Sequence, residues 1–186
     1  RRALRFRPYW KNGGGVTVTG GEPLLQIDFL LEFFALAKAK GIHTTLDTSA
    51  NPFDPDSPEF MDKFEKLMEV TDLVMLDIKE MDPEKHKALT GQTNENILAL
   101  ADWLSDHGKA MWIRHVLVPA LTDDEEGLRA LRAKLDQWTS VERVEILPYH
   151  TLGLFKWENL GIVYPLEGVR TPTLEEVEKA EKILGI

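Results

Sequence analysis

The stretch Gly13–Pro23, with the sequence GGGVTVTGGEP, decides how the rest of the chain is interpreted. Its middle part, Val16–Thr19, consists of β-branched residues, which favour a β-strand. Gly20 and Gly21 allow a sharp turn and a close approach of the backbone to a ligand. Glu22 then stands just past the carboxyl end of the strand, which is where ligands bind in parallel α/β proteins. A plain strand-to-helix turn with a solvated Glu22 explains the same residues, so the rest of the chain must decide.

The composition is that of an ordinary folded domain. The 186 residues are 43% hydrophobic and 28% charged, which is enough for one sizeable core. The net charge of -9 argues against nucleic-acid and anionic-membrane partners. We see no apolar run that could span a bilayer and no secretory signal, so we expect a cytoplasmic protein. The absence of cysteine excludes disulfides and thiolate-bound metals from the chain itself.

Hydrophobic patterns predict five strands that alternate with helices. The expected strands are Val16–Thr19, Ile42–Leu46, Leu73–Lys79, Met111–Val118 and Val144–Leu147. The expected helices cover Gln26–Lys40, Phe60–Met68, Pro83–Leu89, Ile97–Leu104, Leu128–Trp138 behind an Asp123 cap, and Leu174–Leu184. We also expect Arg1–Arg7 to end a helix that Pro8 stops, and Thr151–Pro172 to be a long irregular loop. The alternation implies a parallel sheet in a single domain over residues 1–186, either doubly wound or part of a (β/α) barrel.

Charged or polar groups stand at the carboxyl end of every predicted strand. They are Glu22, Asp47 with Thr48, Asp77 with Lys79, Arg114 with His115, and His150. Charges are costly in apolar runs unless they are paired or bound, and these strand ends meet at one edge of a parallel sheet, so the pattern indicates a ligand site. The carboxylates suit an ammonium group or a shared cation, and the basic groups suit carboxylate or phosphate oxygens. A zwitterionic amino-acid head group would use both kinds.

Each of these groups also has a purely structural explanation. Asp47 would cap the loop that follows it. Asp77 and Lys79 are two residues apart and share a strand face, so they would form a buried ion pair and nothing more. Arg114 would pair with a nearby carboxylate, and His150 would be a hydrogen-bonded core histidine. No nucleophile stands beside a base, so the sequence does not indicate a hydrolytic triad.

Several stretches together resemble a known family. Gly20-Gly21-Glu22 resembles the GGE motif of radical S-adenosylmethionine (SAM) enzymes. The wider resemblance, over essentially the whole chain, is to the pyruvate formate-lyase activating enzymes. It rests on Gly13–Pro23, Gly41–Thr48, Val70–Lys79, Trp112–Arg114 with Val118-Pro119, Leu147–His150, and a tail pattern from Leu152 to Val169. The resemblance implies a partial (β/α) barrel of the radical SAM type, with about five parallel strands and helices on the outside.

The resemblance also implies a reaction and its cofactors. In this family a [4Fe-4S] cluster reductively cleaves SAM to a 5'-deoxyadenosyl radical. That radical takes a hydrogen atom from one glycine of a partner enzyme, such as pyruvate formate-lyase, and leaves a glycyl radical. An electron donor such as flavodoxin is implied as a further partner. We therefore expect an oxidoreductase that binds SAM and acts on a protein.

Individual residues match positions of known roles in the family. The expected SAM-binding residues are Gly20, Gly21, Glu22, Asp47, Lys79 and His150, with Glu22 and the glycine backbone holding the amino group. The expected ligands of a monovalent cation near the SAM carboxylate are Asp47, Thr48, Met75 and Asp77. Arg114 matches a charged position on the substrate side of the site. These roles agree with the charges that the residues alone suggest.

The chain departs from the family pattern at one point. The family binds its cluster through a CxxxCxxC motif in the loop after the first strand, and this sequence has no cysteine. Thr45 stands where some relatives have a cysteine. We interpret the chain as the family domain truncated at its N-terminus, with no catalytic residue of its own, inactive alone, and with the cluster only in a full-length parent. The strand at Gly15–Thr19 would then have an open edge, through which we expect the chain to associate.

Two other interpretations stay open. The chain would be a natural cluster-free module that binds SAM or a partner without catalysis. Alternatively, it would be an unrelated (β/α) enzyme of another zwitterionic or phosphorylated metabolite, with Glu22 and Asp77 as cation ligands. The sequence upstream of Arg1 would separate a fragment from a natural module, and titration with SAM would test the unrelated enzyme.

Overall fold

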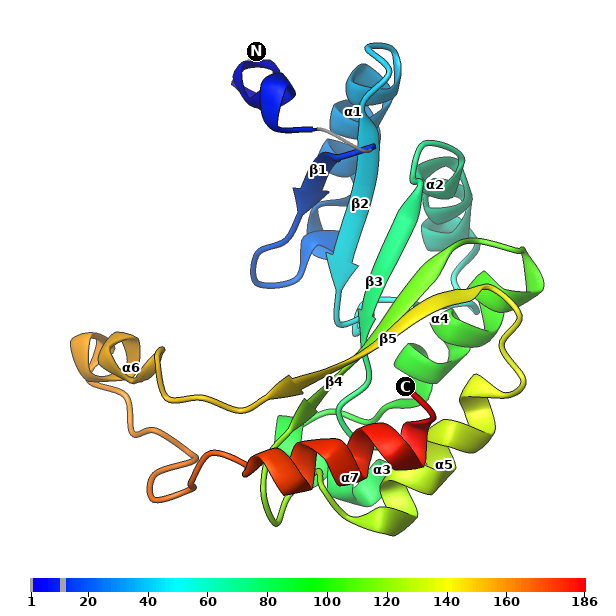
Figure 1. The fold of residues 1–186 in the computed structure, drawn as a ribbon. Helices are drawn as coiled ribbons and strands as arrows, with labels where there is room; N and C mark the ends of the chain where they lie inside the picture. Colours follow the sequence, from blue (N-terminus) through cyan, green and yellow to red (C-terminus); the bar gives the residue numbers. More distant parts are fainter. Residues whose placement is uncertain (1, 11–12) are drawn as a thin grey trace.

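The computed structural model describes residues 2–10 and 13–186, and a single parallel sheet lies at its centre (Figure 1). Arg1 of the expected N-terminal helix lies outside the described residues. The strands are β1 (Gly15–Val18), β2 (His43–Thr48), β3 (Leu73–Asp77), β4 (Met111–Leu117) and β5 (Val141–Pro148). They lie in the order β1-β2-β3-β4-β5, and each neighbouring pair is parallel. A doubly wound sheet reverses its strand order at a switch point, and this sheet does not, so the expected partial barrel is confirmed.

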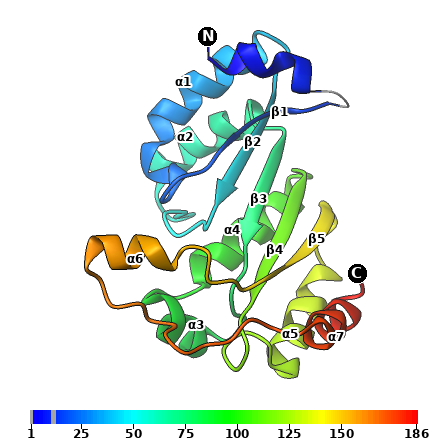
Figure 2. The ribbon, with the colours of Figure 1, turned by 60° about the vertical axis from the view of Figure 1, so that its left-hand side comes forward.

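Helices connect the strands and cover one face of the sheet; Figure 2 shows α1, α2 and α4 on the same side. The helices of the described chain are α1 (Ile27–Lys38), α2 (Pro58–Glu69), α3 (Pro83–Thr90), α4 (Glu95–Asp106), α5 (Glu125–Leu135), α6 (Leu154–Leu160) and α7 (Leu174–Leu184). Two 3-10 segments, η1 (Ala3–Tyr9) and η2 (Pro23–Gln26), precede α1. The core lies between these helices and the sheet, where Phe34, Leu76, Leu100 and Ile113 are fully buried. In the described part of the chain no helix has the length and apolar character needed to cross a membrane.

Local sequence explains where the helices begin. Ser57, Asp82 and Asp124 each accept a hydrogen bond from the backbone N–H three residues later, at the starts of α2, α3 and α5. Thr173 and Glu176 form a reciprocal capping box at the start of α7. These caps satisfy backbone donors that have no partner inside the helix, and so they fix the entry point of each helix.

Four expectations about element boundaries are wrong. Asp124 caps α5, whereas Asp123 accepts a hydrogen bond from the preceding loop. β5 begins at Val141, because parallel pairing with β4 extends it toward its amino end. Pro8 lies inside η1 and does not stop it, since the fixed φ of proline fits a tight helical turn. The helix α6 forms inside the stretch 151–172 that was expected to be irregular.

The second face of the sheet is polar and half-buried. Because side chains alternate along a strand, Asp47 lies on the opposite face from Leu46, and Asp77 lies on the opposite face from Leu76. Toward the amino ends of the strands this face forms a hollow of about 470 Å³, whose lining includes Met75. The sheet therefore presents a polar face that leads to the edge at which the predicted site residues stand.

The outer strand β1 pairs only with β2 among the described residues. The association that we expect through its other edge stays a prediction.

Candidate functional site

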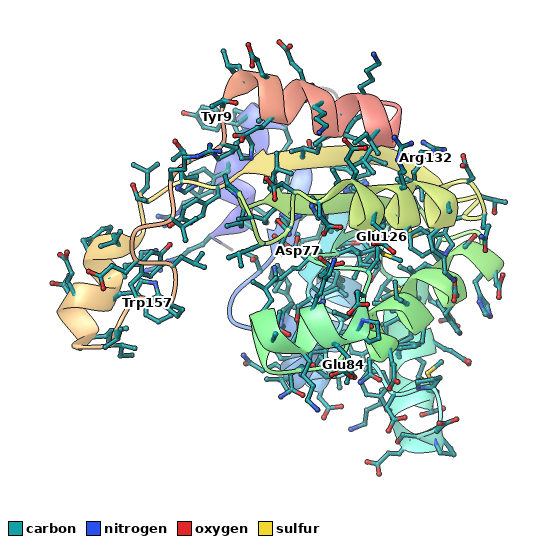
Figure 3. The ribbon with its side chains drawn as sticks, turned by 90° about the horizontal axis from the view of Figure 1, so that it is seen from below. Tyr9, Asp77, Glu84, Glu126, Arg132 and Trp157 are labelled. Carbon is teal, nitrogen blue, oxygen red and sulfur yellow. The ribbon has the colours of Figure 1, made fainter. Side chains whose placement is uncertain are left out.

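Arg114, at the middle of β4 and level with the last residue of β3, is the centre of the site. Its guanidinium lies between two carboxylates: Nη1 donates to Asp47 at 3.2 Å, and Nη2 lies 2.7 Å from Oδ1 of Asp77 and also pairs with Asp47. Nζ of Lys79 lies 3.2 Å from Oδ2 of Asp77. Figure 3 labels Asp77. Asp77 is the register partner of Arg114, so the two side chains project from the same face of the sheet. The structure thus joins four of the predicted residues in one group, which we call the Arg114 cluster: Asp47, Asp77, Lys79 and Arg114.

The Arg114 cluster is largely shielded from water. Only 14% of the Arg114 side chain is exposed, against 18% for Asp47 and 21% for Asp77. Burial by itself lowers the pKa of Arg114, but attraction by Asp77 and then Asp47 outweighs it and raises that pKa above its ordinary value. The guanidinium therefore stays charged in this site.

Two buried atoms of the Arg114 cluster have no hydrogen-bond partner in the described part of the chain. They are Nε of Arg114 and Oδ1 of Asp77; the latter lies close to Nη2 of Arg114 but outside hydrogen-bond geometry. A buried donor or acceptor without a partner costs free energy, so proteins rarely keep one without a reason. The cluster is thus held by ion pairs, in which Oδ1 of Asp77 faces Nη2 of Arg114, and it leaves Nε of Arg114 as a donor without a partner.

Glu22 also stands at this edge, but its carboxylate is fully engaged. Oε1 accepts from the backbone N–H of Leu24 at 2.9 Å and from the hydroxyl of Thr48 at 2.7 Å. Oε2 accepts from the backbone N–H and the hydroxyl of Ser49, at 2.8 and 2.6 Å. Four hydrogen bonds use the acceptor positions of a carboxylate. Glu22 therefore caps η2 and ties the turn after β1 to the end of β2.

The turn of Gly20 and Gly21 is exposed and open. A Cβ built on either residue would meet no atom within 4 Å, and neither residue has a positive φ. Neither packing nor backbone conformation therefore requires glycine here. What the two glycines provide is bare backbone that a ligand can approach closely.

The remaining predicted residues do not all join the Arg114 cluster. Met75 lies beside the cluster, because it is the register partner of Asp47. The hydroxyl of Thr48 is buried and engaged elsewhere: it donates to Glu22 and accepts from the backbone N–H of Ala50 at 2.9 Å. His150 is exposed after β5, and its Nδ1 accepts one long hydrogen bond, at 3.4 Å, from the backbone of Leu152. Within residues 2–10 and 13–186 no three His, Asp or Glu residues form a metal-binding group.

Two residues have a role that the sequence did not reveal. Ser49 supplies two of the four donors to Glu22; the available signal was its hydroxyl directly after Thr48. His115 was expected at the ligand-binding edge, but it is buried, with its ring nitrogens 2.9 Å from the carbonyl oxygen of Ile78 and 2.8 Å from that of Thr122. It ties the end of β3 to the loop after β4 and does not face Arg114.

Comparisons with known sequences agree with this geometry. The model of the radical SAM superfamily matches residues 1–131. The pyruvate formate-lyase-activating enzyme of Streptococcus mutans is 56% identical over 184 residues, which cover 99% of this chain and 70% of that protein. The enzyme of the same name from Listeria monocytogenes is 51% identical over 183 residues, which cover 98% of this chain and 73% of that protein.

Solved structures give the same result. A domain of a pyruvate-formate lyase-activating enzyme from Bacteroides vulgatus superposes with a TM-score of 0.75 at 25% identity, covering 93% of this chain and 94% of that one. A radical SAM methyltransferase from Sphaerobacter thermophilus superposes with a TM-score of 0.68 at 15% identity, covering 98% of this chain and 51% of that one. The second likeness concerns the fold alone.

Proposed function

This chain belongs to the radical SAM superfamily and, within it, to the pyruvate formate-lyase-activating enzymes, and from that premise we propose that its sheet edge binds SAM to generate a glycyl radical on a partner enzyme such as pyruvate formate-lyase. The observation that carries this proposal is the Arg114 cluster, a buried charged group in which one donor, Nε of Arg114, has no partner among the described residues. The cluster lies next to the carboxyl end of β2. Glu22 connects the open Gly20-Gly21 turn to that strand end through Ser49.

The methionine end of SAM carries an ammonium and a carboxylate, and the edge offers groups for both. The backbone carbonyls of Gly20 and Gly21, together with Asp47, suit the ammonium. Lys79 and the free Nε of Arg114 suit the carboxylate. Glu22 takes part in holding the amino group by fixing the glycine turn, since its own acceptor positions are filled. His150 would contact SAM from the end of β5.

A monovalent cation is the second proposed ligand of this edge. Asp47, Asp77 and Met75 share one face of the sheet, whereas the hydroxyl of Thr48 is engaged by Glu22 and by the backbone of Ala50. The guanidinium of Arg114 lies between the two carboxylates, so a cation there would replace part of its contact. We expect SAM affinity to be higher in K⁺ than in choline at equal ionic strength.

The chain's own share of the reaction is to bind and orient SAM. When bound, SAM supplies, with an electron from a [4Fe-4S] cluster, the radical that takes hydrogen from the partner's glycine. The 186 residues include no cysteine, so they do not fit as cluster ligands, and a cluster that acts with this chain takes its thiolates from elsewhere. Flavodoxin as the electron donor and a cytoplasmic location remain predictions.

The same lack of cysteine favours a second candidate function. The chain would bind SAM or a partner without catalysis, as a module. A chimera separates the two functions: the 184 matched residues of the Streptococcus mutans enzyme are replaced by this chain. We expect the chimera, with reconstituted cluster, SAM and a reductant, to give the electron paramagnetic resonance signal of a glycyl radical on pyruvate formate-lyase.

Variants of the chimera test the site itself. Lys79→Met removes a proposed SAM contact and should abolish most of the signal, whereas Lys182→Met, on the exposed side of α7, should leave it unchanged. A chimera that binds SAM but gives no radical would favour the module. One that neither binds SAM nor gives a radical would contradict both functions.

A further inference from the structure

Residues 151–163 form an apolar arm that leaves the body of the protein after β5. Figure 1 shows α6, the helix of the arm, standing away from the sheet. Five large apolar side chains of the arm are exposed: Leu152 (77%), Phe155 (55%), Leu160 (71%), Ile162 (53%) and Val163 (81%). So many exposed apolar side chains within a dozen residues mark an interaction surface.

The arm is anchored at its root. The hydroxyls of Tyr149 and Tyr164 lie 2.6 Å apart, and Tyr149 is buried. The ring of Trp157 packs edge-on against Tyr164, with centroids 5.5 Å apart. Gly161, in the left-handed conformation, ends α6, and Ile162 donates back to the carbonyl of Trp157 at 3.1 Å. The inner aromatic residues thus hold the arm in place, so a partner would meet a preorganised surface at a small entropic cost.

The arm also lies beside the proposed site. It begins directly after His150, at the carboxyl end of β5, and Glu145 of β5 is the register partner of Arg114. Figure 2 shows α6 on the side of the molecule where the strands end. A protein that brings a glycine to the Arg114 cluster must cover this edge and therefore reaches the arm.

We propose that the apolar arm is a docking surface for the enzyme whose glycine is activated, and that it binds an apolar patch next to that glycine. This inference rests on the proposed function, in which the substrate is a protein that must reach the Arg114 cluster. Interface cores are apolar and depleted of charged residues, and the exposed side chains of the arm include the aromatic Phe155. An anionic membrane would call for several basic residues, and residues 151–163 include one, Lys156.

A pair of matched variants tests the arm. Leu160→Ser with Val163→Ser removes two exposed side chains of the arm, and Leu25→Ser with Leu36→Ser removes two exposed side chains of η2 and α1. Surface plasmon resonance measures the affinity of each chain for pyruvate formate-lyase, and calorimetry measures its affinity for SAM. We expect the arm variant to lose affinity for pyruvate formate-lyase by about tenfold or more, with SAM affinity unchanged. The control variant should keep both affinities.

Each other outcome overturns the inference. Equal affinity of the arm variant and the unmodified chain for pyruvate formate-lyase would show that the arm does not dock it, and the proposed function would stand. A loss of SAM affinity in the arm variant would indicate that the arm covers the SAM site and does not dock a protein. A change in self-association alone, seen by light scattering, would assign the arm to a second copy of the chain. If the unmodified chain binds SAM but not pyruvate formate-lyase, the partner in the proposed function fails, and the docking surface fails with it.

Discussion

Glu22 and Arg114 are both charged residues at the carboxyl edge of the sheet, and their surroundings differ in one respect. Glu22 accepts four hydrogen bonds, which leaves its carboxylate saturated. Arg114 contacts two carboxylates and still leaves its Nε without a partner among the described residues. A charged residue in a recognisable motif, such as Glu22, can therefore stabilise the fold and leave ligand contacts to a residue outside the motif, such as Arg114. We propose that the number of unsatisfied atoms separates the two roles.

The largest effect is expected from removing the charge of Arg114. Arg114→Leu leaves Asp47 without a counter-ion and Asp77 with Lys79 alone, so we expect the free energy of unfolding to fall by about 3 kcal/mol or more. Urea denaturation measures it, and Arg114→Lys, which keeps a charge, is the control with a smaller loss. A loss under about 1 kcal/mol would show that the carboxylates do not depend on Arg114.

Glu22→Gln should have the next largest effect on stability. The amide nitrogen of glutamine would face N–H or O–H donors that now point at an oxygen, so we expect a loss of about 1–3 kcal/mol in the free energy of unfolding. The matched control is Glu32→Gln, at an exposed position of α1, which should change little. Unchanged stability of the Glu22 variant would mean that the four hydrogen bonds do not hold the turn.

Ser49→Ala tests the same contact with a smaller change. It removes the hydroxyl bond to Glu22 and keeps the backbone N–H bond, so we expect a loss of about 1 kcal/mol in the free energy of unfolding. In the background of Glu22→Gln the same substitution should cost less, because its partner is already changed. Fully additive losses would argue against a direct contact.

Asp72 provides a saturated carboxylate far from the ligand edge, before β3. Burial raises its pKa, but hydrogen bonds from Lys38 and Thr44 outweigh this and lower the pKa below its ordinary value of 3.8. A lowered pKa stabilises the fold above that value, and the contribution is lost as pH falls through the folded-state pKa. We therefore expect the stability difference between the unmodified chain and Asp72→Asn to shrink below about pH 4. A constant difference down to pH 2 would contradict this.

Local patterns predicted much of the fold and part of the site. The five strands follow from β-branched and apolar runs, and the Asp77–Lys79 ion pair follows from the spacing of two residues on one strand face. The helix α6 was missed because it is only seven residues long and buries no side chain, so no polar face alternates with a buried one. The saturation of Glu22 was missed because its partner Ser49 is 27 residues away in sequence. Its contact exists only after β1 and β2 pair.

The most direct test of the contrast between Glu22 and Arg114 is calorimetric titration of the folded chain with SAM. Three proteins are compared at a temperature where all are folded: the unmodified chain, Arg114→Lys and Glu22→Gln. We expect Arg114→Lys to lose about tenfold in affinity, because it lacks the free Nε–H. We expect Glu22→Gln to lose less, within about threefold, because Glu22 acts on the amino group only through the glycine turn. Loss of SAM binding in Glu22→Gln, with full affinity in Arg114→Lys, would contradict the assignment of Glu22 to the fold and Arg114 to the ligand.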